Sequence, residues 1–270
     1  MYRLPLNAAL LASLVVSMQA TAQPKNAALT GTARITRTNG MATVASNDPR
    51  PLDQAIIAIR EEYGLLVDYE DPIYTAADLV DDTDPAWKER HPDRPSVTRV
   101  RGNSFATSYS EATVTSPAGR EDLLRKIISD YNQSGNPGQF KLVTEDKSRF
   151  AVVPLSATPL DEVVNLNAGP YSLADAVSAL AKAISNTSHI RVVVGSMPLG
   201  PLSQGTYPDD GKPEPARNKL ASILESAGLP LVYQLLYDAD SGQYFLNYFV
   251  ARQAWTSPTG ERLLTPLHRH

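Results

Sequence analysis

The chain has 270 residues, of which 42% are hydrophobic and 20% charged, so it can form the packed core of one large domain or two small ones. The formal net charge of −4 and the lack of a Lys/Arg cluster argue against a nucleic-acid partner. The absence of Cys excludes disulfides, thiol catalysis and thiolate metal sites.

The N-terminus has the three-part layout of a Sec-type signal peptide. A positive charge precedes the uncharged apolar run Ala8–Val16, and small residues at Ala20 and Ala22 fit a cleavage site before Gln23. The run is shorter than the roughly 20 residues that a spanning helix needs, and no later stretch is long and apolar enough. No Cys follows the run, which excludes a lipoprotein. We therefore expect residues 1–22 to be removed and the mature protein to be periplasmic or secreted, without a membrane span.

Helix and strand patterns alternate along the rest of the chain. Apolar residues at helical spacing predict four helices, over Pro51–Tyr63, Arg120–Tyr131, Ser172–Ile184 and Ala216–Ala227. Apolar, β-branched and aromatic runs predict strands at Thr32–Arg37, Leu65–Tyr69, Phe140–Val143, Phe150–Val153, Ile190–Val194, Leu231–Tyr237 and Tyr244–Val250, with extended structure in Ser96–Thr115. Two long connections, Asp71–Pro95 and Gly195–Pro215, are rich in Pro, and the polar tail Ala254–His270 is expected to fray.

The first helix carries the clearest local signals. Pro51 suits a first helical turn, and Asp53 places a negative charge at the positive end of the helix dipole. Gly64 can take the left-handed conformation that ends a helix. Ser172 is a good N-cap for the third helix, with Asp175 close to the position of a capping box.

One unit, a helix followed by a strand or hairpin, occurs four times along the chain. A single unit cannot bury its own apolar face, so we expect the units to pair. We predict an α+β fold of two small halves with mixed sheets, divided near Pro154–Gly169. The expected organisation is a signal peptide over 1–22, a first half over 23–155, a second half over 170–253 and a tail over 254–270.

The pattern Leu52-x2-Ala55-Ile56-x2-Ile59-x3-Tyr63-Gly64-Leu65-x-Val67-x-Tyr69 resembles the short N-terminal domain of secretins and TonB-dependent receptors. The resemblance covers Thr32–Asp71, and Arg217–Tyr248 is a second candidate copy. It implies a small periplasmic module of two βαβ-like units whose usual role is to dock another protein. No secretin ring domain, receptor plug or barrel follows here, and the Asp/Pro-rich stretch after Asp71 departs from the family pattern.

A search for catalytic groups finds only weak candidates. No two of the four His form the helical pair of a zinc protease, and phosphate-binding glycine motifs are absent. His91 and Asp93 in one loop and Ser203 in another are the candidates for a hydrolase built from the long connections. Ser178 and Lys182, one helical turn apart, are more simply explained as surface residues. The sequence therefore predicts no catalytic residue and no cofactor.

Two acidic clusters were considered as cation sites. Asp78, Asp81, Asp82 and Asp84 share one loop, and Asp238–Gly242 opens like a calcium loop. The twelfth position of that loop, which would need a bidentate Glu, is Phe249 in an apolar strand. A hairpin turn explains Asp238–Gly242 without an ion, and no metal ligands are predicted.

Aromatic residues concentrate in the last predicted hairpin. Tyr244 and Tyr248 share one face of its second strand, and Phe245 and Phe249 share the other. Such a strand is either buried on both faces or leaves one apolar face for a partner.

These observations favour an exported, non-enzymatic periplasmic module that docks an envelope protein through sheet edges or helix faces. A secreted hydrolase with a loop-built site and a binder of a small ligand or glycan between the two halves are the alternatives. The oligomeric state is left open.

Overall fold

The computed structural model describes residues 33–145, 149–203 and 205–268, so the predicted signal peptide lies outside the described residues. The helices are α1 (Pro51–Tyr63), α2 (Pro85–Arg90), α3 (Pro117–Asn132), α4 (Leu173–Ser188), α5 (Leu199–Ser203) and α6 (Ala216–Glu225), with the 3-10 helices η1 (Ala76–Asp78), η2 (Glu111–Thr115) and η3 (Pro159–Asp161). The strands are β1 (Arg34–Thr38), β2 (Met41–Ser46), β3 (Leu66–Glu70), β4 (Leu79–Asp81), β5 (Thr98–Val100), β6 (Phe105–Ser110), β7 (Phe140–Thr144), β8 (Arg149–Pro154), β9 (Val163–Val164), β10 (Gly169–Ser172), β11 (Val192–Val194), β12 (Thr206–Asp209), β13 (Glu214–Pro215), β14 (Leu231–Asp238), β15 (Gln243–Val250), β16 (Arg252–Thr256) and β17 (Arg262–Pro266).

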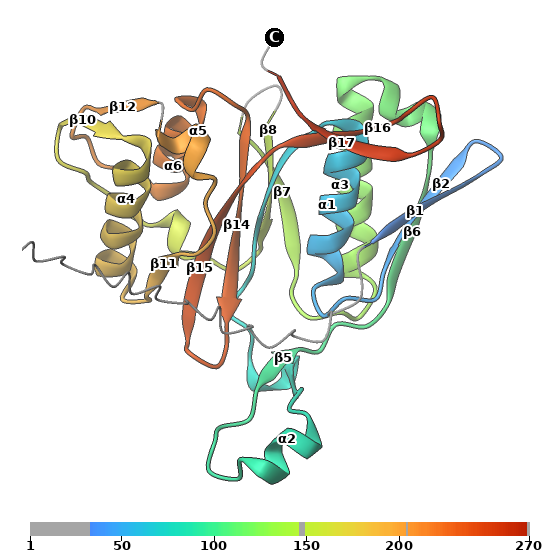
Figure 1. Ribbon diagram of the computed structural model, residues 1–270, viewed down its shortest axis with the longest axis horizontal. Helices are drawn as coiled ribbons and strands as arrows, with labels where there is room; N and C mark the ends of the chain where they lie inside the picture. The colour runs from blue at the N-terminus through green and yellow to red at the C-terminus, as the bar shows by residue number, and fades with distance from the viewer. Residues whose placement is uncertain (1–32, 146–148, 204, 269–270) are drawn as a thin grey trace, which may run out of the picture. The chain divides into compact units, whose positions relative to one another are not determined.

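A central sheet organises these elements, with strand order β11-β15-β14-β3-β8-β7 in the described residues. It mixes parallel pairs, such as β3 with β8, and antiparallel pairs, such as β14 with β15. Figure 1 shows α1 and α3 on one side of this sheet and α4 and α6 on the other. The fold is therefore α+β, as the sequence predicted.

Each half of the chain contributes three neighbouring strands and two helices to the sheet. In the first half, α1 leads to β3 and α3 leads to the hairpin β7–β8. In the second half, α4 leads to β11 and α6 leads to the hairpin β14–β15. Two separate apolar clusters follow from this division, one beneath α1 and α3 and one beneath α4 and α6. The four repeated units expected from the sequence are thus present.

The direction of the strands explains why the two helix pairs lie on opposite faces. β3 and β14 run parallel, β14 and β15 antiparallel, and β15 and β11 parallel, so β11 runs opposite to its counterpart β3. The steps from β3 to β8 and from β11 to β15 go the same way across the sheet. Connections between parallel strands of one sheet are almost always right-handed. Because β11 runs opposite to β3, the right-handed connection from β11 to β15 passes over one face of the sheet and the connection from β3 to β8 passes over the other.

The local signals of the sequence work as expected. Pro51 opens α1, and Gly64 closes it in the left-handed region with φ 63°. The hydroxyl of Ser172 accepts a hydrogen bond from the backbone N–H of Asp175 and so caps α4. The predicted strand before Asn39-Gly40 forms β1, and both turn residues have positive φ, which joins β1 to β2 by a two-residue loop.

Two expectations about irregular segments are wrong. Asp71–Pro95 is not structureless, because η1, β4 and α2 form within it and β4 pairs with β5. The tail does not fray, because β16 and β17 form an antiparallel hairpin that packs against α1. The sequence feature that indicates this hairpin is the turn Ser257–Gly260, in which Gly260 has a φ of 84°.

The two halves meet at β3 and β14, and we call this junction, with the side chains that cross it, the seam. The two strands share only two register pairs, Gln234 with Tyr69 and Leu235 with Glu70. Beyond them, the Asp71 N–H donates to the Leu235 carbonyl at 2.8 Å. Backbone pairing between the halves is therefore short.

Ion pairs continue the seam where the backbone pairing stops. At one end Arg149 pairs with Asp68 at 2.7 Å; Arg149 donates to the Leu231 carbonyl at 3.0 Å, and Asp68 accepts from the Tyr233 N–H at 2.7 Å. At the other end the pair of Arg50 and Asp71, also 2.7 Å apart, binds the carbonyl and N–H of Tyr237 in the same way. Each ion pair offers β14 one donor and one acceptor, as a neighbouring strand would.

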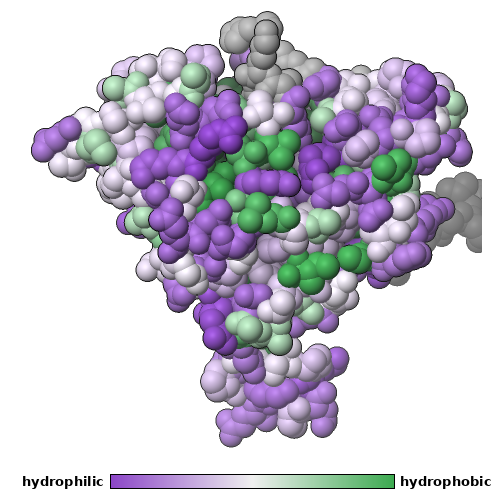
Figure 2. All heavy atoms as spheres, turned by 180° about the vertical axis from the view of Figure 1, so that it is seen from behind, coloured by the Kyte–Doolittle hydropathy of each residue, from purple (hydrophilic) through white to green (hydrophobic). Residues whose placement is uncertain are grey.

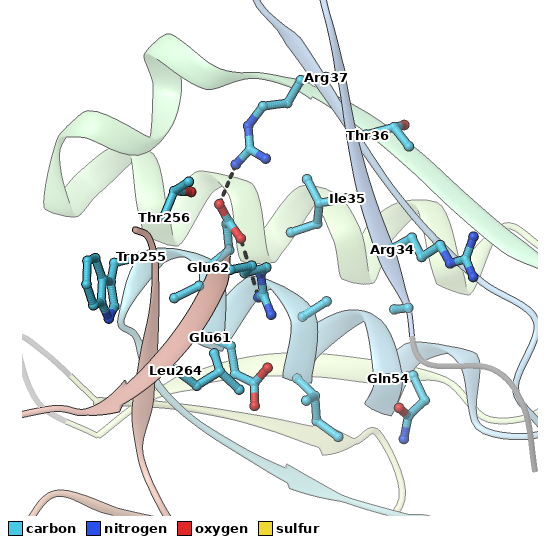
Figure 3. A pocket seen from close by; sticks show the side chains of 15 residues that line it. Arg34, Ile35, Thr36, Arg37, Gln54, Glu61, Glu62, Trp255, Thr256 and Leu264 are labelled. Atoms are coloured by element: carbon cyan, nitrogen blue, oxygen red, sulfur yellow. Dashed lines mark hydrogen bonds and ion pairs between the residues drawn. The ribbon is translucent and has the colours of Figure 1, made fainter. Parts of the chain in front are cut away.

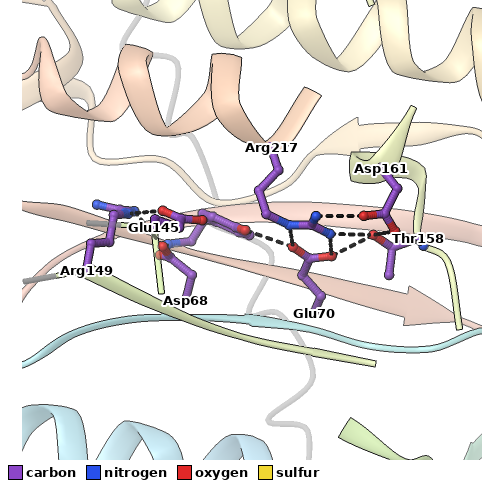
Figure 4. Close-up of polar contacts among 8 residues, drawn as sticks. Asp68, Glu70, Glu145, Arg149, Thr158, Asp161 and Arg217 are labelled. Carbon is purple, nitrogen blue, oxygen red and sulfur yellow. Dashed lines mark hydrogen bonds and ion pairs between the residues drawn. The ribbon is translucent and has the colours of Figure 1, made fainter. Parts of the chain in front are cut away.

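A third charged group crosses the seam beneath α6. The buried carboxylate of Glu70 receives two bonds from Arg217 of α6, at 2.7 and 2.9 Å. The hydroxyls of Tyr233 and Thr158 donate to the same carboxylate at 2.8 and 2.6 Å (Figure 4). All of its strong acceptor sites are thus used, which is the condition under which a buried charge is tolerated.

Arg217→Ala tests whether this buried pairing holds the halves together. We expect it to lower the free energy of unfolding by about 3–5 kcal/mol, because Glu70 would stay buried without a cation. The matched change Arg125→Ala breaks an exposed i,i+4 pair with Glu121 and is expected to cost about 0.5 kcal/mol. Urea denaturation followed by circular dichroism compares the two. Equal losses in both variants would show that the Glu70 pairing is no stronger than a surface contact.

Candidate docking groove

A groove of about 640 Å³ lies over the outer face of α1, between β1 and the hairpin β16–β17 (Figure 3). Its lining comes from three stretches that are far apart in the chain: Ala33, Arg34, Ile35, Thr36 and Arg37; Gln54, Ile57, Ala58, Glu61 and Glu62; Ala254, Trp255, Thr256, Arg262 and Leu264. A helix forms the floor and two strands form the walls.

The floor is the side of α1 that the core does not use. Leu52, Ala55, Ile56 and Ile59 are buried beneath the helix, as the sequence predicted. The lining residues of α1 fall on the opposite side, at the same three- and four-residue spacing. They include the apolar side chains Ile57 and Ala58, which are only half-buried, so the floor has an apolar centre in an otherwise polar stripe.

The first wall is β1, the outer strand of the small sheet β1-β2-β6. Ile35 and Arg37 point from it towards α1, and Arg34 and Thr36 point away (Figure 3). Thr38 pairs with Met41 across the two-residue turn, so the N–H and C=O groups of Thr38 point to β2. In an antiparallel pair every second residue points to the neighbouring strand, so the backbone groups of Thr36 point to β2 as well. The N–H and C=O groups of Ile35 and Arg37 are therefore left on the outer edge.

The second wall is the C-terminal hairpin. Ala254 pairs with Leu264 and Thr256 with Arg262, and Trp255 on β16 is 45% exposed. Sequence reasoning missed this wall because it treated the segment as a frayed tail. The hairpin is anchored to the body at Gly64, where an added Cβ would lie 2.9 Å from the Gln253 side chain.

A charged contact joins both walls to the floor. Glu62 of α1 pairs with Arg37 of β1 at 2.5 Å and with Arg262 of β17 at 3.5 Å. Arg37 also contacts Glu111 at 2.5 Å, and the carboxylates of Glu111 and Glu62 raise the pKa of its guanidinium. The contacts hold the three parts of the groove together at one end.

The strand edges of the fold differ in whether side chains bond their outward-facing backbone groups. On the outer edge of β7, the Asn132 side chain accepts from the Phe140 N–H at 2.9 Å and donates to the Phe140 carbonyl at 2.8 Å. On the outer edge of β11, the Ser185 hydroxyl lies 2.8 Å from the Val192 N and 3.2 Å from its carbonyl oxygen. These side chains occupy the backbone groups that another strand would use.

Within the described residues, no group pairs with the backbone of Ile35 or Arg37 on the outer edge of β1. Each of these caps covers one residue of its edge, Phe140 on β7 and Val192 on β11, whereas neither outward-facing residue of β1 is capped within the described residues. An open edge next to a groove is the geometry in which proteins add a strand from a partner.

The predicted hydrolase residues do not form one described site. His91 stacks on Trp87 with ring centroids 4.8 Å apart, and both His91 and Asp93 are exposed near α2. Figure 1 places α2 at the far end of the excursion between β3 and β6, and α5 beside α6. The side chain of Ser203 lies outside the described part of the chain.

The acidic clusters are used for local structure. Asp78 accepts bonds from Thr75, Asp84 caps α2, and Asp82 pairs with Arg99 at 2.7 Å. Asp240 of the turn Asp238–Gly242 accepts from the hydroxyl of Thr98 at 2.6 Å. Among the described residues, no group of three or more His, Asp or Glu side chains is placed to hold a metal ion.

The aromatic hairpin divides between its two faces. Tyr244 and Tyr248 are buried beneath α4 and α6, whereas Phe245 and Phe249 on the other face are half-buried. Apolar side chains also gather on the face shown in Figure 2, in patches separated by hydrophilic ones.

The strongest pKa shifts lie in the seam and not in the groove. Burial, reinforced by the nearby Asp71 carboxylate, raises the pKa of Asp53 to about 7 although the Gln234 amide donates to it. Burial also raises the pKa of Asp68 to about 6 and that of Glu145 to about 7. Shifted carboxyl groups can mark an active site, but these are enclosed by contacts between the halves. The binder of a small ligand or glycan between the two halves stays an alternative prediction.

Comparison of the chain with protein-family models, curated proteins and solved structures finds no match. Among the described residues, no helix is both long and apolar enough to cross a membrane. The functional argument therefore depends on the geometry of the chain itself.

Asp53→Asn tests the seam through pH. Between about pH 4 and 7 the unfolded chain ionises Asp53 while the folded protein keeps it protonated, so the raised pKa makes wild-type stability fall as pH rises. The variant cannot ionise and retains an acceptor for Gln234. We expect its stability relative to wild type to increase by roughly 3 kcal/mol between pH 4 and 8.

Urea midpoints measured at several pH values provide the comparison, with Asp122→Asn on the exposed side of α3 as the control. If the difference in stability between Asp53→Asn and wild type stays constant with pH, the raised pKa of Asp53 is contradicted.

Proposed function

We propose that this protein is an exported, non-enzymatic interaction module that docks an envelope partner through the groove over α1. The observation that carries the proposal is the outer edge of β1, which has no backbone partner within the described residues and borders the groove. Unpaired backbone groups on a strand edge beside a groove define a place where another chain can add.

The composition of the groove supports a protein partner. Trp255 stands 45% exposed at the rim, and aromatic residues with Arg are the side chains enriched at protein interfaces. Charged side chains of both signs border the apolar centre formed by Ile57 and Ala58: Arg37 and Arg262, with Glu61 and Glu62. An apolar centre with a polar, charged rim is the usual anatomy of a docking site.

The export signal and the family resemblance support the location of this activity. The predicted cleavage after Ala22 would deliver the chain to the periplasm or outside the cell. The resemblance of Thr32–Asp71 to a periplasmic docking domain covers β1, the floor helix α1 and β3. Three of the elements that form or support the groove thus fall in the segment that carries the resemblance.

Site-specific photocrosslinking in the native cell envelope tests the proposal. A photoreactive phenylalanine analogue replaces Thr36 on β1 or Trp255 on β16, and matched probes replace Lys141 on β7 and Arg191 beside β11. We expect the first two positions to crosslink the same envelope protein, identified by mass spectrometry. The control positions should crosslink less, because Asn132 and Ser185 already bond the backbone of Phe140 and Val192 on those edges.

Recovery of a specific partner only from Lys141 or Arg191, or of none from any position, would contradict docking through the groove.

A further inference from the structure

The charge on β1 indicates what kind of segment the open edge accepts, an inference that rests on the proposed docking function. The strand reads Arg-Ile-Thr-Arg-Thr and carries two arginines without an acidic residue. Arg37 is already paired with Glu62 and Glu111. Arg34 is exposed, and within the described residues no carboxylate pairs with it.

The geometry of an added strand follows from the alternation of β1. Such a strand would bond the N–H and C=O groups of Ile35 and Arg37, which lie on the free edge. Its side chains would alternate between the two faces of the small sheet. On one face they meet the floor at Ile57 and Ala58, and on the other they lie beside Arg34.

The two faces of an added strand therefore favour different side chains. On the groove face, Ile57 and Ala58 on the floor and Leu264 on the second wall favour apolar residues in the partner. On the outer face, a carboxylate next to Arg34 forms a cross-strand pair of opposite charge, whereas a basic residue there is repelled. A second copy of this chain fits poorly, since the outer face of another β1 carries only Arg and Thr side chains and would place no carboxylate beside Arg34.

We propose that the groove binds an extended acidic segment of the partner, which adds to β1 as an outer strand of the small sheet. Apolar side chains of the segment face Ile57, Ala58 and Leu264, and acidic side chains stand beside Arg34. The recognised chemistry is thus an alternating apolar and acidic strand of about five residues, the length of β1.

Two synthetic peptides of alternating sequence probe this assignment on the mature full chain. The acidic peptide alternates Val with Asp, and the basic peptide alternates Val with Lys. Each carries a fluorophore, and binding is measured by anisotropy at low salt, where surface charge is least screened. We expect the acidic peptide to bind at least about fivefold more tightly than the basic one.

Arg34→Glu then reverses the charge of the outer face. We expect it to weaken binding of the acidic peptide about fivefold and to strengthen binding of the basic peptide. Lys182→Glu, an exposed position on α4, makes the same change of charge far from the groove and should leave the preference for the acidic peptide as it is in wild type. Among the described residues, no hydrogen bond or ion pair of the Arg34 side chain would be lost on its replacement, so both variants are expected to fold.

The outcomes separate this inference from the docking function. Three outcomes would overturn the acidic-strand assignment. They are equal affinity for the acidic and basic peptides, a preference for the acidic peptide that Arg34→Glu does not alter, and no binding of the acidic peptide at millimolar concentration. If crosslinks from Thr36 and Trp255 persist in that case, the docking function stands with a partner of different chemistry. Loss of those crosslinks as well overturns both.

Discussion

The structure depends on the charged seam between β3 and β14. Each half has its own apolar cluster, yet only two residue pairs of β3 and β14 are in register between the halves. The ion pairs of Arg149 with Asp68 and of Arg50 with Asp71 extend the join by binding the backbone of β14 in the manner of a strand. Because these charges are buried, their removal is costly, and the halves are held at one fixed register.

The seam also explains which surfaces remain for function. Joining the halves edge to edge consumes β3 and β14 and leaves β7 and β11 as the outer strands of the central sheet. Asn132 and Ser185 each cap one residue of those edges, Phe140 and Val192, with side-chain hydrogen bonds. The small sheet has no equivalent device on β1 within the described residues, and the C-terminal hairpin shapes a groove beside it. The open edge of β1 and the groove therefore lie side by side, which makes this the place proposed for strand addition.

Local structure was predictable because short-range signals agree with the long-range packing. The stripe of α1, its first-turn Pro51 and the left-handed Gly64 all indicate one helix with one buried face, and the structure confirms them. The floor of the groove was implicit in the same pattern, since the face opposite Leu52 and Ile56 had to be exposed. Strand order, and with it the placement of the helix pairs on opposite faces, follows from pairings between residues more than 150 positions apart, such as Gln234 with Tyr69.

The seam and the second wall were not predictable from sequence patterns. Asp68 and Glu70 alternate with apolar residues in β3, which reads as one solvated face, yet that face is buried beneath α6 and satisfied by Arg149 and Arg217. The C-terminal hairpin is polar on its exposed side and gains its stability from packing on α1, so its composition resembles that of a loose tail. In both cases distant partners decide the conformation.

The central claim is that the outer edge of β1, beside the groove, is open to an added strand. Amide hydrogen exchange of the isolated mature protein, resolved by residue with NMR, tests it directly. The account predicts that the amides of Ile35 and Arg37 exchange rapidly, that those of Thr36 and Thr38 are protected by β2, and that Phe140 and Val192 are protected by their side-chain caps. Protection of Ile35 and Arg37 equal to that of Thr36 would show that the edge is already covered and would contradict the account.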